Sequence, residues 1–155
     1  MLRLYAYEEK YQDDLIRFLK KCLPQSGRCL DLKGRHDVYL KVEDTFEHFW
    51  CLYNDDEMIG TVALKRLDSQ RCELKSLYLA ERYQGIGLGS ALLETAIKEA
   101  GREGYAEMLL DTLATSKRAL ALYEKMGFVS TDRYNDNRMA DIFMRLQIKG
   151  NNLNG

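Results

Sequence analysis

Three glycines at alternate positions constrain this chain more than any other feature of its sequence. They occur in the stretch Gln84-Gly85-Ile86-Gly87-Leu88-Gly89, between an expected strand and the start of an amphipathic helix. Alternating glycines let backbone N–H groups converge on one point without interference from Cβ atoms, and a helix N-terminus adds positive potential there. Such a nest can hold a diphosphate, although glycines that only form a tight turn give the same pattern. The surrounding sequence has to decide between the two interpretations.

The strand expected before the glycines contains an irregularity. Residues 72–80 alternate in the manner of a strand, but the apolar step from Leu74 to Leu77 is three residues instead of two. A slip of this kind predicts a β-bulge, which releases backbone groups from their regular pairing.

The other segments alternate between strand and helix signals, which predicts an α/β fold, of mixed α+β type, with a mixed sheet covered by helices. In the first half we expect a strand over 2–7, a helix from Glu8 to about Leu23 that Pro24 ends, a loop over 25–47 with one helical turn, and a hairpin of 49–53 and 58–65. After the bulged strand we expect a helix over 88–103 capped by Gly104 and a strand over 106–111. A helix over 117–126, capped by Ser116 and ended by Gly127, and strands over 128–134 and 141–148 complete the chain.

The composition is that of one globular domain. The chain has 155 residues, 46% of them hydrophobic and 30% charged, which predicts a single domain over 1–149 and a polar, frayed tail over 150–155. A formal charge of −1 argues against a nucleic-acid partner. No apolar run exceeds five residues, so no membrane span is expected. The N-terminus resembles no signal peptide and the four cysteines form no CxxC pair, which together predict reduced thiols in a cytoplasmic protein.

Two kinds of phosphate-binding loop fit the glycines less well. A nucleoside-triphosphate loop requires a Lys followed by Ser or Thr after its last glycine, and none is present. A dinucleotide-binding fold gains support from Asp111, 26 residues after Gly85, near the position of a ribose-binding acid. However, Ser90 stands where the third glycine belongs, and the chain that remains is too short for the second half of a doubly wound sheet.

Residues 72–128 resemble the GNAT superfamily of acyl-CoA-dependent N-acetyltransferases. The stretch CELKSLYLAERYQGIGLGSALL is similar to its acetyl-CoA motif, in which a bulged strand precedes Arg or Gln, two residues, Gly, one residue, and Gly or Ala. ALALYEKMGF is similar to its next motif, a helix that carries Ala and then Leu-Tyr before Gly-Phe. Two departures stand out: Gln84 replaces the commoner Arg, and Ser116 replaces a frequent Asn. Gln84 offers no charge to phosphates, which puts more weight on the backbone N–H groups.

The resemblance implies a single-domain GNAT-like fold, with a twisted mixed sheet whose central strand is bulged and splayed, flanked by helices. It implies that acetyl-CoA, as acetyl donor, pairs with the backbone at the edge of the bulged strand and enters the glycine nest, without any metal. The coenzyme-binding residues implied are Leu77, Tyr78, Leu79, Gln84, Gly85, Ile86, Gly87, Leu88, Gly89, Ser116 and Tyr123.

The resemblance also implies catalytic residues. Tyr123 matches a tyrosine that lies near the coenzyme sulfur and can protonate the departing thiolate, although a tyrosine in this helix can equally be a buried aromatic. Glu73 matches an acidic position that some members use as general base; otherwise it is a solvent-facing strand residue paired with Lys75 or Arg71. Asp111 is the second candidate base, and we favour for it the role of orienting the turn before Ser116.

The implied reaction is direct acetyl transfer from acetyl-CoA to a primary amine within a ternary complex, with strand N–H groups stabilising the oxyanion. One alternative is a non-catalytic acyl-CoA-binding sensor or partner subunit with the same fold. Another is an unrelated acetyltransferase with a cysteine nucleophile, but His36 and His48 stand in no motif with a cysteine. The acceptor is either a small-molecule amine or a protein amino group, and the chain is either a monomer or a homodimer.

Three features bear on the acceptor. Residues 1–60 hold 9 basic and 12 acidic side chains, and the remainder 14 and 12, which favours a cationic amine, although the acids of 8–14 also suit a helix N-terminus. Four aromatic residues can form an apolar wall for the acceptor: Tyr39, Phe46, Phe49 and Trp50. At least two of them are expected in the core instead. Residues 133–141 are polar enough to reach a substrate, and a solvated loop is the interpretation we favour.

Overall fold

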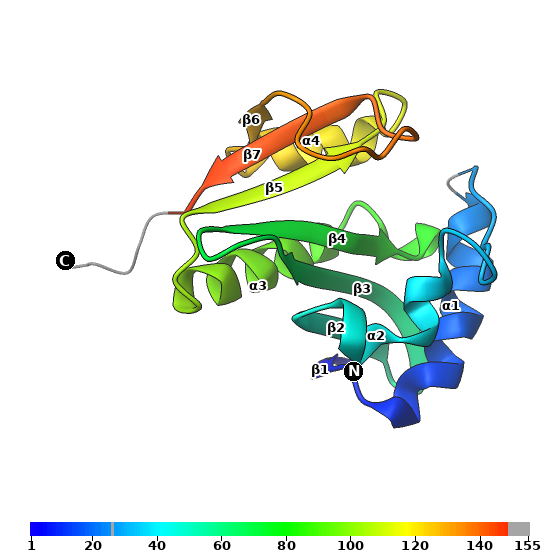
Figure 1. The fold of residues 1–155 in the computed structure, drawn as a ribbon. Coiled ribbons are helices and arrows are strands. Elements are labelled where there is room, and N and C mark those ends of the chain that lie inside the picture. Colours follow the sequence, from blue (N-terminus) through cyan, green and yellow to red (C-terminus); the bar gives the residue numbers. More distant parts are fainter. Residues whose placement is uncertain (26, 149–155) are drawn as a thin grey trace.

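A computed structural model describes residues 1–25 and 27–148 of the chain. Its seven strands form one mixed sheet in the order β1-β2-β3-β4-β5-β7-β6 (Figure 1). The strands are β1 (Leu2–Ala6), β2 (His48–Asn54), β3 (Glu57–Arg66), β4 (Arg71–Leu79), β5 (Glu107–Thr112), β6 (Val129–Ser130) and β7 (Ile142–Gln147). All neighbours pair antiparallel except β4 and β5, which are parallel because helix α3 connects them. The expected mixed α/β fold with a helix-flanked sheet is therefore confirmed.

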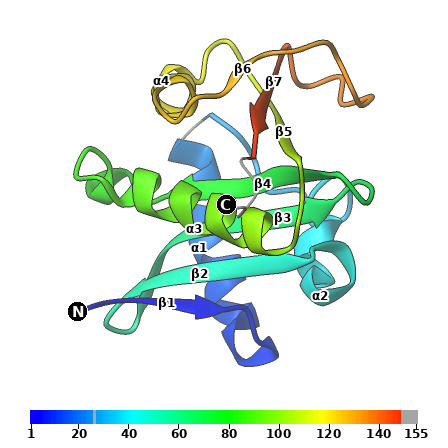
Figure 2. The ribbon, with the colours of Figure 1, turned by 90° about the vertical axis from the view of Figure 1, so that its left-hand side faces the viewer.

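Helices cover both faces of the sheet. The α-helices are α1 (Gln12–Gln25), α2 (Val42–Thr45), α3 (Leu88–Arg102) and α4 (Lys117–Lys125), and the 3-10 turns are η1 (Glu9–Tyr11), η2 (Asp37–Leu40) and η3 (Glu81–Tyr83). Helix α1 with α2 lies on one face and α3 with α4 on the other (Figures 1 and 2). Strand β2 shows why two cores form: Phe49 and Cys51 pack toward α1, whereas Leu52 packs toward α3.

The irregularity in β4 is the bulge that the apolar spacing predicts. Between the pairs Ala63–Lys75 and Thr61–Tyr78, two residues of β4 stand opposite one residue of β3. Ser76 has a positive φ of 54°, a conformation that costs energy for a residue with a side chain. Two hydrogen bonds hold it there: the Thr61 hydroxyl donates to the Ser76 carbonyl at 2.7 Å, and the Tyr39 hydroxyl lies 2.7 Å from the Ser76 hydroxyl. The bulge is thus a fixed feature of the sheet.

Several expected boundaries differ from the observed ones. Pro24 lies inside the last turn of α1, which continues to Gln25 and does not end before the proline. The loop before β2 contains two short helical turns, η2 and α2, where one was expected. Of the strand expected over 128–134, Val129 and Ser130 pair with β7, and the Thr131 amide donates to the Phe143 carbonyl at 2.9 Å. The expected tail over 150–155 lies outside the described residues. None of the helices in the described part combines the length and apolar character needed to cross a membrane.

Candidate active site

The parallel strands β4 and β5 separate partway along their length. Their pairing runs from Arg71–Glu107 to Glu73–Leu109, and no later pair joins them in the described residues. Figure 1 shows the two strands together at one end and apart at the other, where the bulge lies on β4. The backbone edge of β4 beyond Glu73 is therefore free of a strand partner in β5, and an extended ligand can pair with it. Leu77, Tyr78 and Leu79, the expected backbone ligands, all lie in this part of β4.

The glycine stretch forms the N-terminus of α3, beside the end of β4. Gly85 and Gly87 have positive φ angles of 84° and 90°, and Gly87 is the N-cap of the helix. A Cβ atom on Gly87 would meet nothing within 4 Å, so open space lies in front of it. Ile86 is 69% exposed, whereas Leu88 at the first helical position packs against the core. The loop has the positive φ angles that an anion-binding nest requires, and the described chain leaves the space in front of Gly87 open.

Gln84 does not point its side chain at this nest. Its side-chain amide donates to the Leu79 carbonyl at 3.0 Å, which ties the loop to the end of β4. A cation comes instead from α4, because a Cβ on Gly85 would lie 3.7 Å from the Arg118 guanidinium. Sequence reasoning missed Arg118, since nothing in the chain's local pattern indicates that α4 crosses beside the glycine loop.

Helix α4 also carries Tyr123, which faces inward. The ring is 7% exposed and packs against Phe128, with centroids 5.7 Å apart. Its hydroxyl makes no hydrogen bond with the described residues, which is unusual for a buried phenol. Burial, with a smaller contribution from Tyr78, raises the pKa of Tyr123 to about 12, so the phenol stays protonated at neutral pH. Ser116 occupies the N-cap position of α4 as expected, but its side chain makes no capping hydrogen bond.

The two candidate carboxylates meet through one asparagine. The Asn135 amide donates to Asp111 at 2.7 Å and to Glu73 at 3.2 Å, and the Tyr134 hydroxyl donates to Glu73 at 2.5 Å. Glu73 is 4% exposed and lies 3.6 Å from the Lys75 ammonium, so the pairing with Lys75 is present but a solvent-facing position is wrong. The turn before Ser116 is oriented by Asp141, which accepts from the Ala114 amide at 2.7 Å, and not by Asp111.

A shallow cavity of about 460 Å³, wide open to solvent, lies beside these carboxylates. It is lined by residues of β4, of β5 and of two loops: Arg35, Lys75, Asp111, Asn135, Asp136, Asn137 and Met139. The segment over 133–141 is therefore a wall of the site and not only a solvated loop, which corrects the interpretation favoured from the sequence.

Other candidates lie away from this cavity. Tyr39, Phe46 and Phe49 are core residues, as expected for at least two of the four aromatic candidates. All four cysteines are free; burial raises the pKa of the Cys22 thiol to about 11 and those of Cys51 and Cys72 to about 12, which makes these three poor nucleophiles.

His48 stacks on Trp50 and pairs with Glu99 and Glu103 near the end of α3. With Glu47 and Glu103 it forms a group whose ligand atoms lie within 4.8 Å, and none of the three lines the cavity.

Known proteins share this architecture. The chain is 33% identical to the uncharacterized N-acetyltransferase YsnE of Bacillus subtilis over 90 residues, which are 57% of this chain and 60% of that protein. An acetyltransferase from Streptococcus agalactiae superposes with a TM-score of 0.85 at 21% identity, covering 94% of this chain and 98% of that one. YncA of Salmonella typhimurium, a putative acetyltransferase solved with its cofactor acetyl-CoA, superposes with a TM-score of 0.73 at 19% identity, covering 96% and 95%.

The matches to three curated relatives span 37%, 48% and 60% of the relatives' own length. The sequence profile of the acetyltransferase (GNAT) family matches residues 7–128, which include both motifs, the bulged strand and the glycine loop. The chain therefore belongs to the GNAT family of acetyltransferases.

Proposed function

We propose that this protein transfers an acetyl group from acetyl-CoA to a primary amine in a ternary complex. The observation that carries the proposal is the free edge of β4, which is followed in the chain by the glycine loop at the N-terminus of α3. The buried Tyr123 hydroxyl on α4, which makes no hydrogen bond in the described residues, adds to it. A long donor with a diphosphate at one end and a thioester at the other fits this sequence of groups. The amine enters from the opposite side, through the cavity beside Asp111.

The residues present fit the acetyl donor. The amides of the stretch 85–89 and the N-terminus of α3 would hold its diphosphate, with Arg118 supplying the charge that Gln84 lacks. The free edge of β4 would pair with its pantetheine arm. Because the Leu79 carbonyl already accepts from Gln84, this pairing falls mainly to the residues before it. When bound, the donor supplies an activated thioester carbonyl.

Asp111 is the carboxylate placed to take a proton from the acceptor. It lines the cavity, whereas Glu73 is 4% exposed and lies behind Asn135. An alkylammonium must lose one proton before its nitrogen can attack, and Asp111 passes that proton to solvent. Glu73 acts on this step through Asn135, which it orients together with Tyr134.

The remaining proton movements balance the transfer. As the C–N bond forms and the C–S bond breaks, the nitrogen loses a second proton to solvent through Asp111, and the departing sulfur takes one from Tyr123. The phenol then recovers its proton from solvent. The net products are an amide, a free thiol and one proton. No covalent bond to the protein forms.

The test measures coenzyme binding and thiol release separately. Acetyl-CoA should raise the melting temperature, whereas NAD and ATP should not. With a broad panel of amines, Tyr123→Phe and Asp111→Asn should each lower kcat by about 10²–10³ while keeping the affinity for coenzyme A within about threefold. Glu73→Gln should cost less, because it acts through Asn135.

Binding of acetyl-CoA without release of its thiol in the presence of any amine would contradict the proposal and favour a coenzyme-binding sensor. Unchanged turnover in both Tyr123→Phe and Asp111→Asn would contradict the assigned roles. A loss of turnover on alkylation by iodoacetamide, with coenzyme binding intact, would instead support a cysteine nucleophile.

A further inference from the structure

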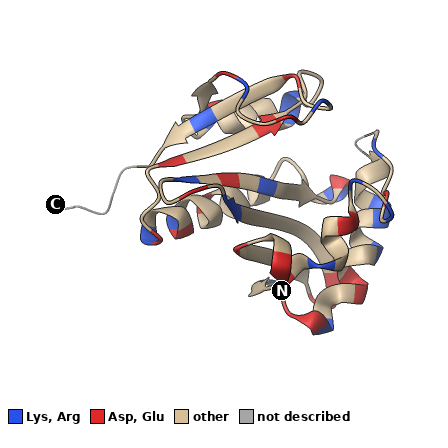
Figure 3. Cartoon of the chain, viewed as in Figure 1, with Lys and Arg blue, Asp and Glu red and all other residues tan. Residues whose placement is uncertain are grey.

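The cavity beside Asp111 carries charges of both signs. Arg35, from the loop before η2, and Lys75, from β4, contribute two cations, and Asp111 and Asp136 contribute two carboxylates. Figure 3 shows acidic and basic positions close together on β4 and an acidic position at the end of β5. A site for a simple cationic amine would need only the carboxylates, and two cations in its wall would repel that ligand.

The two cations differ in the ion pairs and hydrogen bonds that they make within the protein. Lys75 lies 3.6 Å from Glu73 and is half-buried. Arg35 is exposed, and within residues 1–25 and 27–148 its guanidinium makes no hydrogen bond or ion pair. A guanidinium presents a rigid fork of donors that matches a carboxylate or phosphate, so an unpaired Arg in a cavity wall is suited to an anionic group.

The electrostatics of the surrounding residues support the same interpretation. Arg28, on the same loop as Arg35, lies close enough to oppose the rise in the pKa values of both Tyr39 and Tyr123. The loop after α1 therefore carries, besides Arg35 and the acid Asp31, an arginine whose charge acts near Tyr39 and Tyr123. The cavity wall carries two basic and two acidic side chains, whereas residues 1–60 carry more acids than bases. Half of those acids lie on α1, on α2 and in the β2–β3 turn, and none of the acids of residues 1–60 lines the cavity.

We propose that the acceptor is a primary amine that carries an anionic group close to its nitrogen, an amino acid being the simplest example. Arg35 binds the anionic group, with Lys75 adding charge, while Asp111 faces the ammonium. This inference rests on the proposed acetyl transfer and follows the same balance of bonds and protons. The anionic group can be a carboxylate or a phosphate, since a guanidinium pairs with either.

The test compares acceptors that differ only in the anionic group. Thiol release from acetyl-CoA is measured with the common α-amino acids, each beside its uncharged amide, and with O-phosphoethanolamine beside ethanolamine. For the best pair, kcat/KM should be at least tenfold higher for the anionic member, which corresponds to about 1.4 kcal/mol. In Arg35→Gln this ratio should fall to about one, mainly through a higher KM, and Arg35→Glu should reverse it. Lys33→Gln removes a charge from the same loop outside the cavity wall and should keep the wild-type ratio.

Each result decides the inference. A preference for amino acids over their amides identifies a carboxylate, and a preference for O-phosphoethanolamine over ethanolamine identifies a phosphate. Turnover of amines and amides with no preference, or a preference that persists in Arg35→Gln, overturns this inference and leaves acetyl transfer standing. A lack of amine-dependent thiol release with every acceptor overturns both. Arg35 is exposed, so melting temperatures of its variants should stay within a few degrees of wild type and show that folding is intact.

Discussion

At the scale of single residues, the site departs from the family motif at Gln84, and the structure shows where the missing charge comes from. Gln84 ties the loop to the Leu79 carbonyl, and the Arg118 guanidinium lies beside Gly85. A cation on α4 can therefore serve the same nest from across the loop. A cation on α4 can replace one at position 84 because the Coulomb energy of an anion depends on its distance from the charge and not on where the charged residue stands in the chain.

Arg118 yields a prediction about coenzyme affinity. Arg118→Gln should raise the Kd for coenzyme A about tenfold, since an exposed charge-assisted contact is worth about 1–2 kcal/mol. The loss should shrink at high salt, because screening weakens the wild-type contact. Titration calorimetry at low and high ionic strength measures both effects.

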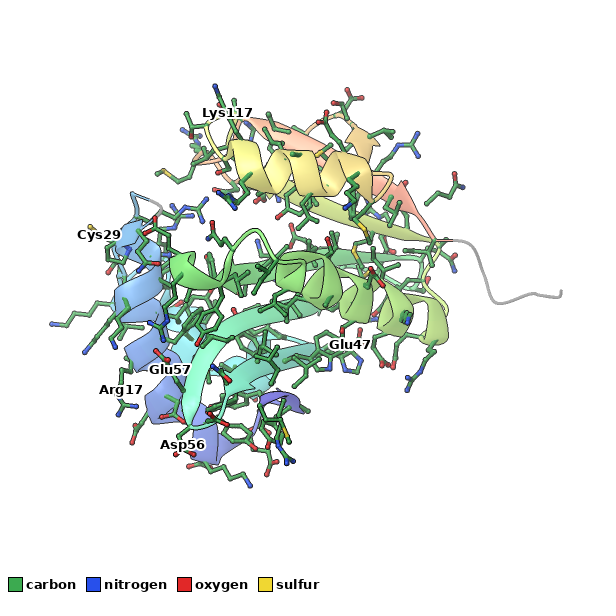
Figure 4. All side chains as sticks on the ribbon, turned by 180° about the vertical axis from the view of Figure 1, so that it is seen from behind. Arg17, Cys29, Glu47, Asp56, Glu57 and Lys117 are labelled. Atoms are coloured by element: carbon green, nitrogen blue, oxygen red, sulfur yellow. The ribbon has the colours of Figure 1, made fainter. Side chains whose placement is uncertain are left out.

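The matched control is the preceding residue. Lys117 projects from the outer side of α4 (Figure 4), and Lys117→Gln should keep the Kd within about twofold of wild type. Equal losses in the two variants would show that only the general charge of α4 matters, and that Arg118 has no specific contact.

At the scale of elements, helix α3 has a glycine of left-handed conformation at each end. Gly87 has a φ of 90° at the N-cap, and Gly104 has a φ of 86° just after the C-terminus. A Cβ on either would meet nothing within 4 Å. The two positions thus carry the same backbone requirement, but only one of them lies at the proposed coenzyme site.

Comparing Gly87 with Gly104 separates a structural role of the glycine from a role in ligand binding. Gly87→Ala and Gly104→Ala should each lower the free energy of unfolding by about 1 kcal/mol, because a side chain is strained at positive φ. Only Gly87→Ala should also weaken coenzyme binding, by at least tenfold, since its methyl group enters the space before the nest. Chemical denaturation and calorimetry of both variants provide the comparison. Equal coenzyme affinities would mean that the glycines only form a turn.

At the scale of the whole molecule, stability depends on cores on both faces of the sheet, and these cores contain thiols. Cys51 and Cys72 are 0% exposed, and burial raises the pKa of each to about 12. An unfolded thiol ionises near pH 8.5–9, whereas the folded one stays protonated to about pH 12. The folded state therefore binds more protons between these values, and its stability is complete below about pH 9 and falls above it.

The alkaline loss should be measurable. Between pH 7 and pH 10, each of these two thiols should lower the free energy of unfolding by about 1.4–2 kcal/mol. Cys51→Ala should be less stable than wild type at pH 7 because it leaves a cavity, yet lose about 1.4–2 kcal/mol less on going to pH 10. Urea denaturation at the two pH values measures the difference.

Cys29 is exposed on the loop after α1 (Figure 4), so Cys29→Ala should keep the wild-type pH dependence. An identical alkaline loss in Cys51→Ala would show that its thiol does not contribute. The location of the protein in the cell and its oligomeric state stay predictions.

Local sequence patterns were enough to predict the features of the site that lie within one segment. The apolar step from Leu74 to Leu77 predicted the bulge, the glycines predicted the loop before α3, and the spacing around Tyr123 predicted its helix. Turn chemistry and side-chain periodicity act within a few residues, so they can be read from one segment at a time. The residues assigned within these segments remain predictions of role, although their positions are now clear.

The side chains that line the cavity beside Asp111 could be identified only from the folded structure. Asn135 and Tyr134 reach Glu73 across 61 or more positions of sequence, and Arg35 from the loop before η2 lines the same cavity as Asp111 from β5. Sequence reasoning favoured a solvated loop over 133–141 because its polar residues carry no periodicity. Their partners are carboxylates on other strands, and the conformation of such a loop is set by the hydrogen bonds that these buried groups require, which no local pattern records.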